Sequence, residues 1–259
     1  MTERTLVVIL SGGLQTRFRK DARGTSYEDL AETTPKLLFP LNPTNETPFS
    51  RQLEALQLVR GEKQVRVPVS REFYEMTERA AARYRWLFGL DIEVLPNEAT
   101  TNETRLGALA DLERSLYGDW SQALVSPSDR VPRKGYRSAP FLEAAAERDC
   151  LYVMRTHVQT LEEAKSHGVI TINEEGRILE FHEKPENPTT TDIAFANYVF
   201  RPEDGTTLQV HNRSGYPLDP PGHFIAYQVE QGERVYTFYV DPEIIQDVGR
   251  LDHYLKVRE

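Results

Sequence analysis

The sequence predicts an α/β protein in which a mainly parallel sheet is covered by helices. Two observations support this prediction. The first half of the chain alternates apolar, strand-like runs with segments of helical periodicity, which is typical of parallel sheets. After Met154 the spacing changes to that of β-hairpins, which adds a small β-rich accessory portion. No repeat, low-complexity tract or long linker interrupts the 259 residues, so we expect a single domain over residues 1–259.

The first elements follow from apolar patterning. Leu6 to Leu10 is a continuous apolar run, typical of a strand buried on both faces, and we expect it to be the central strand. A helix capped by Ser50 should end near Gly61. Val65 to Val69 then alternates as a strand, and a long helical pattern runs from Ser70 to Gly89.

The later elements are expected from the same signals. Ile92 to Leu95 and Ala123 to Val125 are short strands, and the leucines between 106 and 116 recur at helical spacing and should be core residues. The remaining expectations are a helix over 140–148, strands over 151–154, 169–172, 178–181, 197–200 and 235–240, and a final helix after Gly249 in which Leu251, Tyr254 and Leu255 share a face. The proline-rich stretch from Gly205 to Gly222 is expected to be a loop.

Composition excludes several classes of partner. Lys plus Arg number 31 against 40 Asp plus Glu, for a net charge of −9, the reverse of a protein that grips nucleic acid through its phosphates. The single cysteine, Cys150, cannot form an intramolecular disulfide, which fits a reducing compartment, and we expect a cytoplasmic protein. No apolar run is long enough for a membrane span or a signal peptide, so no membrane partner is expected.

A glycine-containing loop directly after the first strand is the first candidate for ligand binding. Gly12 and Gly13 in the segment from Ser11 to Arg17 let backbone N–H groups approach an anion, and Arg17 adds a planar phosphate contact. The alternative is an ordinary strand-to-helix turn. The loop matches neither the Walker A pattern nor the G-x-G-x-x-G fingerprint, which excludes those two readings.

Two lysines are candidates for further phosphate contacts. Lys36 follows Pro35, whose fixed backbone can aim the ammonium group, and Lys184 stands beside Glu183 at the end of an expected strand, before a proline. Taken singly, Lys36 fits a solvated surface lysine equally well, and Glu183 and Lys184 fit surface salt bridges.

Asp129 and Asp247 are acids placed between a short apolar strand and a glycine- or proline-punctuated turn. Two carboxylates converging on one cleft could hold Mg²⁺, which prefers oxygen ligands, although either residue could instead cap a helix. The six histidines show no metal-ligand spacing, and no Ser/His/Asp arrangement is legible, which argues against zinc and hydrolase chemistry.

The order of these motifs resembles the sugar-1-phosphate nucleotidylyltransferase family. The resemblance rests on Gly12-Gly13-x-x-Thr16-Arg17, Pro35-Lys36, Ser128-Asp129, Gly176-Arg177-Ile178 leading to Phe181-x-Glu183-Lys184-Pro185, and Asp247-Val248-Gly249 with Tyr254. It implies a Rossmann-like fold with the active site along the carboxyl edge of the sheet. It also implies a nucleotide-binding portion over about 1–135, a sugar-phosphate-binding portion over about 136–259, and the joining of a nucleoside triphosphate to a sugar 1-phosphate. A homo-oligomer stays open.

The resemblance also implies residue roles. Ser11, Gly12, Gly13, Thr16 and Arg17 would wrap the triphosphate, with Lys36 nearby and Thr104 close to the nucleotide. Asp129 and Asp247 would hold Mg²⁺, Lys184 would grip the sugar phosphate, and Glu183 and Asn197 would bind sugar hydroxyls. In this scheme the catalytic set is Arg17, Lys36, Asp129 and Lys184.

The chain departs from the family pattern in three places. Gln15 stands where the family has a third glycine, and the segment between Arg17 and Pro35 is longer than usual, as for an extra lid or contact surface. The chain also ends soon after Asp247, so we expect no β-helix domain.

The expected substrates are a purine triphosphate and a hexose or cyclitol phosphate, with pyrimidine bases open. Two alternatives stay open as well: a non-catalytic binding relative with a regulatory role, motivated by Gln15, and a cytidylyltransferase acting on a non-sugar phosphate.

Overall fold

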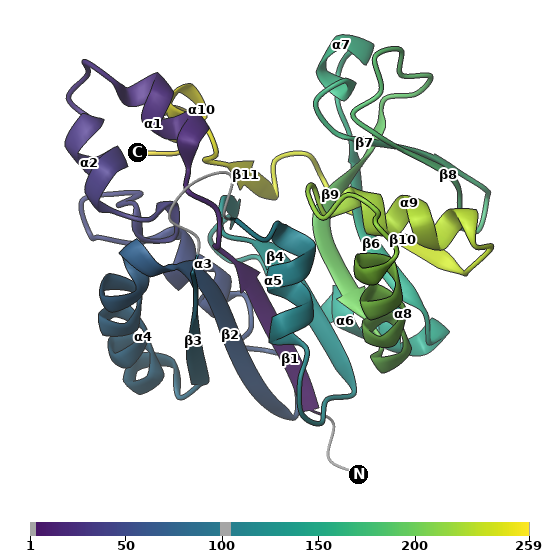
Figure 1. The fold of residues 1–259 in the computed structure, drawn as a ribbon, viewed down its shortest axis with the longest axis horizontal. Coiled ribbons are helices and arrows are strands. Elements are labelled where there is room, and N and C mark those ends of the chain that lie inside the picture. The colour runs from purple at the N-terminus through teal and green to yellow at the C-terminus, as the bar shows by residue number, and fades with distance from the viewer. Residues whose placement is uncertain (1–3, 99–104, 259) are drawn as a thin grey trace.

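The core of the molecule is a mainly parallel sheet with strand order β10-β6-β9-β4-β1-β2-β3 (Figure 1). The computed structural model describes residues 4–98 and 105–258. In sheet order the strands are β10 (Val235–Tyr239), β6 (Leu151–His157), β9 (Asp192–Phe200), β4 (Gln122–Pro127), β1 (Arg4–Leu10), β2 (Glu62–Ser70) and β3 (Asp91–Asn97). Along this path only β9 runs antiparallel to its neighbours. The predicted mainly parallel α/β sheet is therefore confirmed.

Two smaller β elements flank this sheet. The hairpin of β7 (Gly168–Ile172) and β8 (Ile178–Glu183) joins the start of β9, where the accessory portion was expected. A separate two-stranded antiparallel sheet pairs β5 (Arg130–Pro132) with β11 (Ile245–Asp247). The sequence did not predict this second sheet.

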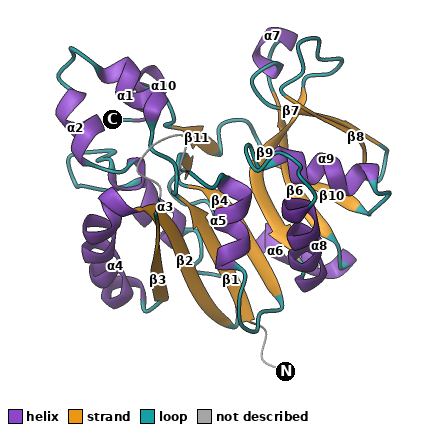
Figure 2. Cartoon of the chain, in the orientation of Figure 1, coloured by secondary structure: helices purple, strands orange, loops and turns teal. Residues whose placement is uncertain are grey.

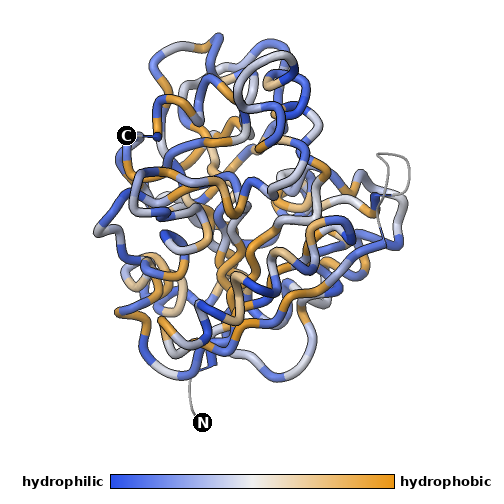
Figure 3. Tube along the Cα trace, turned by 90° about the vertical axis from the view of Figure 1, so that its left-hand side faces the viewer, coloured by the Kyte–Doolittle hydropathy of each residue, from blue (hydrophilic) through white to orange (hydrophobic). Residues whose placement is uncertain are grey.

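Helices cover both faces of the sheet, because alternate residues of each strand point to opposite faces (Figure 2). Val7 and Ile9 of β1 pack with α3 (Pro48–Glu54), α4 (Tyr74–Phe88) and α6 (Ala139–Arg148). Leu6 and Val8 pack with α5 (Ala108–Ser115), α8 (Pro202–Arg213) and α9 (Gly222–Glu230). Figure 3 shows apolar residues along the interior strands and hydrophilic residues in the outer loops.

A third, smaller cluster lies at the carboxyl edge of the sheet. It joins α1 (Thr16–Ala22), α2 (Glu28–Thr33) and α10 (Leu251–Val257), and it includes Phe18, Phe39, Val131, Val248 and Tyr254. In Figure 1 these helices lie on one side of this edge, while α7 (Leu161–Ala164), β7 and β8 lie on the other. The remaining short helices are η1 (Lys36–Leu38) and η2 (Arg71–Phe73).

The largest error of the sequence interpretation concerns residues 205–222. The expected loop is occupied in its first half by α8, which continues to Arg213. Pro202 stands in the first turn of this helix, where a missing N–H costs nothing, and Leu208 is fully buried in the core. α9, which begins at Gly222, was not expected either.

Several boundaries also differ from expectation. α3 begins at Pro48, is capped by Thr47 rather than Ser50, and ends at Glu54 rather than near Gly61. Leu106, expected in the core, is 43% exposed, and Leu255 is 44% exposed although Tyr254 beside it is fully buried. Among the described residues, no helix is long and apolar enough to span a membrane.

Candidate active site

The candidate site lies where the strand order of the sheet reverses. From β1 the chain proceeds to β2 and β3 on one side, whereas β4 lies on the other side of β1. In open α/β sheets, ligands bind outside the carboxyl ends of the strands at such a switch point. Here the glycine loop leaves β1 and Ser128-Asp129 leaves β4, and the Ser128 amide donates to the Leu10 carbonyl at 2.9 Å.

The loop after β1 has a buried side and an exposed side. Ser11 and Gly12 are buried, whereas Gly13, Thr16 and Arg17 are exposed. A Cβ atom on Gly12 would lie 1.9 Å from Oδ2 of Asp111, so any side chain there must displace the Asp111 carboxylate. The exposed side chain of Arg17 makes no hydrogen bond or ion pair with another described residue, so its guanidinium can reach a ligand.

Lys36 and Asp129 form an ion pair at the centre of the site. The Lys36 Nζ lies 2.7 Å from Oδ2 of Asp129. Burial opposes ionisation of Asp129, but the charges of Lys36 and Arg130 outweigh this effect and lower its pKa to about 2. Asp129 is therefore a carboxylate at neutral pH.

Asp129 and Asp247 come together through the small β5–β11 sheet. The Val248 amide donates to the Asp129 carbonyl at 2.9 Å, and Asp247 pairs with Arg130 across the ladder. A Cβ atom on Gly249 would lie 2.9 Å from Oδ1 of Asp247 and 3.1 Å from Oδ2 of Asp129. Both carboxylates therefore lie beside Gly249, which has no side chain to fill the space next to them.

This pair of acids is a small donor set. Among the residues that the structure describes, no group of three or more His, Cys, Asp and Glu side chains is arranged to hold a metal ion. Two carboxylates nevertheless suit Mg²⁺, which keeps several waters and takes its other ligands from substrate phosphates.

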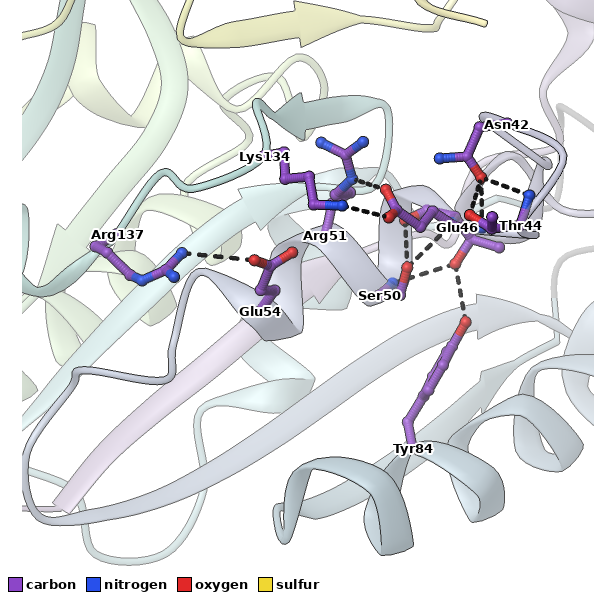
Figure 4. Close-up of polar contacts among 10 residues, drawn as sticks. Asn42, Thr44, Glu46, Ser50, Arg51, Glu54, Tyr84, Lys134 and Arg137 are labelled. Carbon is purple, nitrogen blue, oxygen red and sulfur yellow. Dashed lines mark hydrogen bonds and ion pairs between the residues drawn. The ribbon is translucent and has the colours of Figure 1, made fainter. Parts of the chain in front are cut away.

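Helix α3 supports the turn that carries Asp129. The Gln52 side-chain amide donates to the carbonyls of Pro127 and Arg130 at 2.8 and 2.9 Å, and so holds both ends of the turn. Polar contacts fix α3 itself: Glu46 binds Arg51 and Lys134, and Glu54 pairs with Arg137, as Figure 4 shows. The Thr47–Ser50 capping box begins the helix.

Glu183 and Lys184 stand together at the end of β8. Lys184 has a left-handed backbone (φ 50°), and its amide donates to the His167 carbonyl at 3.0 Å. The Glu183 side chain is buried against the start of α9, where a Cβ atom on Gly222 would lie 1.8 Å from its Oε2. Burial raises the pKa of Glu183, although Lys184 opposes the shift.

His167 shows that the two sides of the site are electrostatically connected. Burial lowers the pKa of His167 to about 4, and the charges of Arg130 and Lys184 lower it further while Asp247 opposes them. Charged groups in β5 and β11 and directly after β8 therefore act on one imidazole.

Asn197, a predicted site residue, makes no hydrogen bond to these residues. Asn197 is buried, its Nδ2 donates to Ser126 Oγ at 2.8 Å, and it lines an internal cavity of about 20 Å³ beside Gln52 and Tyr136. Asn197 is therefore one of the lining residues of this cavity. Thr104 lies outside the described residues.

Sequence reasoning missed several residues of this neighbourhood. Arg130 binds Asp247 at 3.1 Å, and its only signal was its position directly after Asp129. Nothing local marked His167, Gly222 or Asp111, because their roles arise from contacts with segments distant in sequence.

Fold and site together define a doubly wound α/β protein with a site of glycines, basic side chains and paired carboxylates at its switch point. The family model described as nucleotidyl transferase matches residues 6–259. The chain belongs to the nucleotidyl transferase family, which confirms the predicted resemblance.

Curated relatives match part of the chain. It is 29% identical over 111 residues to a glucose-1-phosphate adenylyltransferase of Trichlorobacter lovleyi, covering 36% of this chain and 27% of the relative. It is also 29% identical over 110 residues to a UTP–glucose-1-phosphate uridylyltransferase of Synechocystis sp., covering 42% and 27% respectively. The alignments thus span about a quarter of these relatives.

Solved structures share the fold over the whole chain. A putative glucose-1-phosphate thymidylyltransferase from Bacillus anthracis matches with a TM-score of 0.72 at 15% identity, over 98% of this chain and 94% of that one. A UDP-glucose pyrophosphorylase complexed with UDP-glucose matches with 0.72 at 17% identity, over 100% and 97%. The inositol-1-phosphate CTP transferase from T. maritima matches with 0.70 at 14% identity, over 100% and 98%. These likenesses confirm the predicted fold.

Proposed function

We propose that this protein is a Mg²⁺-dependent nucleotidylyltransferase that joins a nucleoside triphosphate to a sugar 1-phosphate or a sugar-like phosphate and releases pyrophosphate. The observation that carries the proposal is the ion-paired Lys36–Asp129 couple beside Asp247 at the switch point of the sheet. Membership of the nucleotidyl transferase family supports it.

The reaction needs two anions to meet. An oxygen of the acceptor phosphate attacks the α-phosphorus in line, a new P–O bond forms, and the bond to the β-phosphate oxygen breaks as pyrophosphate leaves. Arg17 and Lys36 would contact the triphosphate, and Lys184 would contact the acceptor phosphate. These side chains would screen the repulsion and stabilise the charge that develops on the transferred group, a type of contribution worth several kcal/mol.

Asp129 and Asp247 would hold Mg²⁺. The low pKa of Asp129 keeps this ligand ionised, and the absence of a side chain on Gly249 leaves room between the carboxylates. When bound, the ion supplies charge neutralisation and orientation to the phosphates. No protein nucleophile is required, because the acceptor phosphate itself attacks.

Glu183 would accept hydrogen bonds from hydroxyl groups of the acceptor, since its buried carboxylate stands next to Lys184. Asn197, whose Nδ2 donates to Ser126 Oγ on β4, would also bind hydroxyl groups of the acceptor. The preferred pair is a purine triphosphate with a hexose or cyclitol phosphate, and the likeness to a glucose-1-phosphate adenylyltransferase supports this choice.

The test is pyrophosphate release from a matrix of ATP, GTP, UTP, CTP and dTTP against glucose 1-phosphate, mannose 1-phosphate, inositol 1-phosphate and phosphocholine. We expect Mg²⁺-dependent release, abolished by chelation, for at least one sugar or cyclitol phosphate. Release with CTP and phosphocholine alone would favour a non-sugar cytidylyltransferase. Nucleotide binding without turnover by any pair would contradict the proposal and favour a regulatory binding relative.

A further inference from the structure

Gln15 occupies an unusual conformation at the start of α1. Its backbone is left-handed, with φ 47° and ψ 33°, a region that costs free energy for every residue with a side chain. Such strain persists only where surrounding contacts over-determine it. The question is therefore what the Gln15 side chain does that holds it there.

Both polar atoms of the Gln15 side chain form hydrogen bonds within the protein. Its Nε2 donates to the carbonyls of Ala31 and Thr34, both at 2.7 Å. Its Oε1 accepts from the backbone amide of Lys36 at 2.9 Å. The residue is only 8% exposed, so these bonds form away from bulk water, where leaving a polar group unpaired is costly.

These bonds join the glycine loop to the segment that carries Lys36. Gln15 immediately precedes Thr16 and Arg17, while Lys36 reaches Asp129 with its Nζ at 2.7 Å. One amide group thus connects the loop, the end of α2 and the backbone of Lys36. The segment between Arg17 and Pro35 is tied down by this contact and by Arg19, whose Nε donates to the Ala31 carbonyl at 3.2 Å.

We infer that Gln15 is a positioning residue that sets Lys36 against Asp129 and fixes the distance between Lys36 and Arg17. The inference rests on the proposed function, because it assigns Gln15 to the triphosphate side of that site. Gln15 does not project onto the exposed side of the loop formed by Gly13, Thr16 and Arg17. It therefore takes the place of a glycine without obstructing the loop.

Two variants isolate the side-chain bonds from backbone strain. Gln15→Gly adopts the left-handed region freely but loses all three bonds. Gln15→Asn tolerates this region and keeps an amide, but it is one methylene too short to reach the same partners. Asn45→Gly is the matched control, since Asn45 is also a left-handed residue (φ 59°) but is exposed and is none of the proposed site residues.

With the most active pair of the substrate matrix, we expect both Gln15 variants to lower kcat/KM for the triphosphate about tenfold. This is roughly the effect of weakening one charged contact, here the contact of Lys36 with the triphosphate. KM for the acceptor phosphate should stay within about twofold, because Lys184 and Glu183 are untouched. The backbone amide of Lys36 should exchange with solvent faster in both variants, measured by NMR. Asn45→Gly should match the wild type.

The outcomes separate this inference from the proposed function. Unchanged triphosphate kinetics and unchanged Lys36 exchange in both variants would overturn the role of Gln15 while leaving the enzyme assignment intact. An equal rise in KM for both substrates would also overturn it, because a residue that positions only the triphosphate side should leave KM for the acceptor unchanged. If the wild type turns over no pair, the proposed function fails. The role of Gln15 is then decided by the exchange of the Lys36 amide and by calorimetric binding of MgATP. Faster exchange with weaker binding in both variants would support it, and no change in either would overturn it.

Discussion

The carboxylate of Asp129 is under two opposing influences. Burial favours its neutral form, while the adjacent charges of Lys36 and Arg130 favour the ionised form and prevail, so that its pKa is about 2. A group with a lowered pKa contributes stability above its unfolded value near 4, and this contribution is lost only as the pH falls toward 2. Asp129 therefore stays ionised wherever the protein is expected to work.

Replacing either acid should remove turnover without removing the fold. We expect Asp129→Asn and Asp247→Asn each to reduce Mg²⁺-dependent pyrophosphate release by at least about 10²-fold, because each loses a charged ligand. Circular dichroism should show unchanged secondary structure, since neither side chain belongs to the apolar clusters.

The matched control for these variants is Asp252→Asn, an exposed acid on α10. Its activity should equal that of the wild type. Full activity in both Asp129→Asn and Asp247→Asn would refute the metal assignment.

Asp204 gives a pH prediction that is independent of the site. It accepts from the Arg201 amide and from Gln228 Nε2, and burial raises its pKa to about 6. The folded state therefore binds a proton more tightly than the unfolded state, so stability falls as the pH rises from about 4 to 6. Asp204→Asn removes this penalty, and Gln228 can turn its unpaired Oε1 toward the new amide.

Between pH 4.5 and pH 8, we expect the free energy of unfolding of Asp204→Asn to rise by about 2 kcal/mol relative to that of the wild type, because the pKa of Asp204 is raised by roughly two units. Urea unfolding at the two pH values measures it. A difference between variant and wild type that does not change with pH would show that Asp204 is not a buried, reluctantly ionised carboxyl group.

At the scale of elements, one small apolar cluster fixes the spacing of the charged residues. Phe18 follows Arg17, Phe39 lies three residues after Lys36, and Val248 follows Asp247; all are buried in the cluster formed by α1, α2 and α10. Val131 from β5 joins them. Because interiors pack densely, four segments that share one cluster cannot shift independently.

Tyr254 is the centre of this cluster and provides its test. Its ring contacts Phe18 and Phe39, and its hydroxyl donates to the Pro40 carbonyl at 2.7 Å. Tyr254→Phe should lower the free energy of unfolding by about 1 kcal/mol, the net worth of one hydrogen bond. Tyr216→Phe, at a 40% exposed position, should cost less, and equal effects would argue against the bond.

The elements predicted from sequence are those with a strong local pattern. β1 and β4 contain continuous apolar runs, and α4 has helical periodicity over fifteen residues and a left-handed C-cap at Gly89. The β5–β11 sheet has only three residues in each strand, too few for any pattern, and it forms because distant segments meet. α8 was missed because Pro217, Pro220 and Pro221 suggested a loop, although all three lie beyond the end of the helix at Arg213.

At the scale of the whole molecule, the two portions would bind different substrates. A Cβ atom on Gly12 would meet Asp111 in the portion proposed to bind the nucleotide, and one on Gly222 would meet Glu183 in the portion proposed to bind the acceptor. An added methyl group must displace Asp111 or Glu183, because each would lie under 3.0 Å away. Each glycine thus offers a change confined to one portion.

We expect Gly12→Ala to raise KM for the triphosphate and Gly222→Ala to raise KM for the acceptor phosphate, each about tenfold, with little effect on the other substrate. Steady-state kinetics with each substrate varied in turn measures the split. Gly205→Ala, whose methyl group would meet Trp120 at an ordinary 3.5 Å, is the control. The same pattern of losses in both variants would argue against two separate binding portions.

The same scale explains how much of the site could be predicted. Loops that follow buried strands meet at one edge of a parallel sheet, so the glycine loop and Asp129 could be expected to converge. Asp247 could be paired with Asp129 from its position beside a glycine-containing turn and from the family resemblance, because β11 is too short to show a strand pattern. The bonds of Gln15 and the burial of Asn197 depend on side-chain packing, which no local sequence signal encodes.

The central claim is most directly tested by crystallography of the protein with Mn²⁺ in place of Mg²⁺ and with the nucleotide sugar of its most active pair. Anomalous scattering should place the ion in contact with both Asp129 and Asp247, with the diphosphate between Arg17 and Lys184. An ion bound elsewhere, or a nucleotide sugar remote from the carboxyl ends of β1 and β4, would contradict the account.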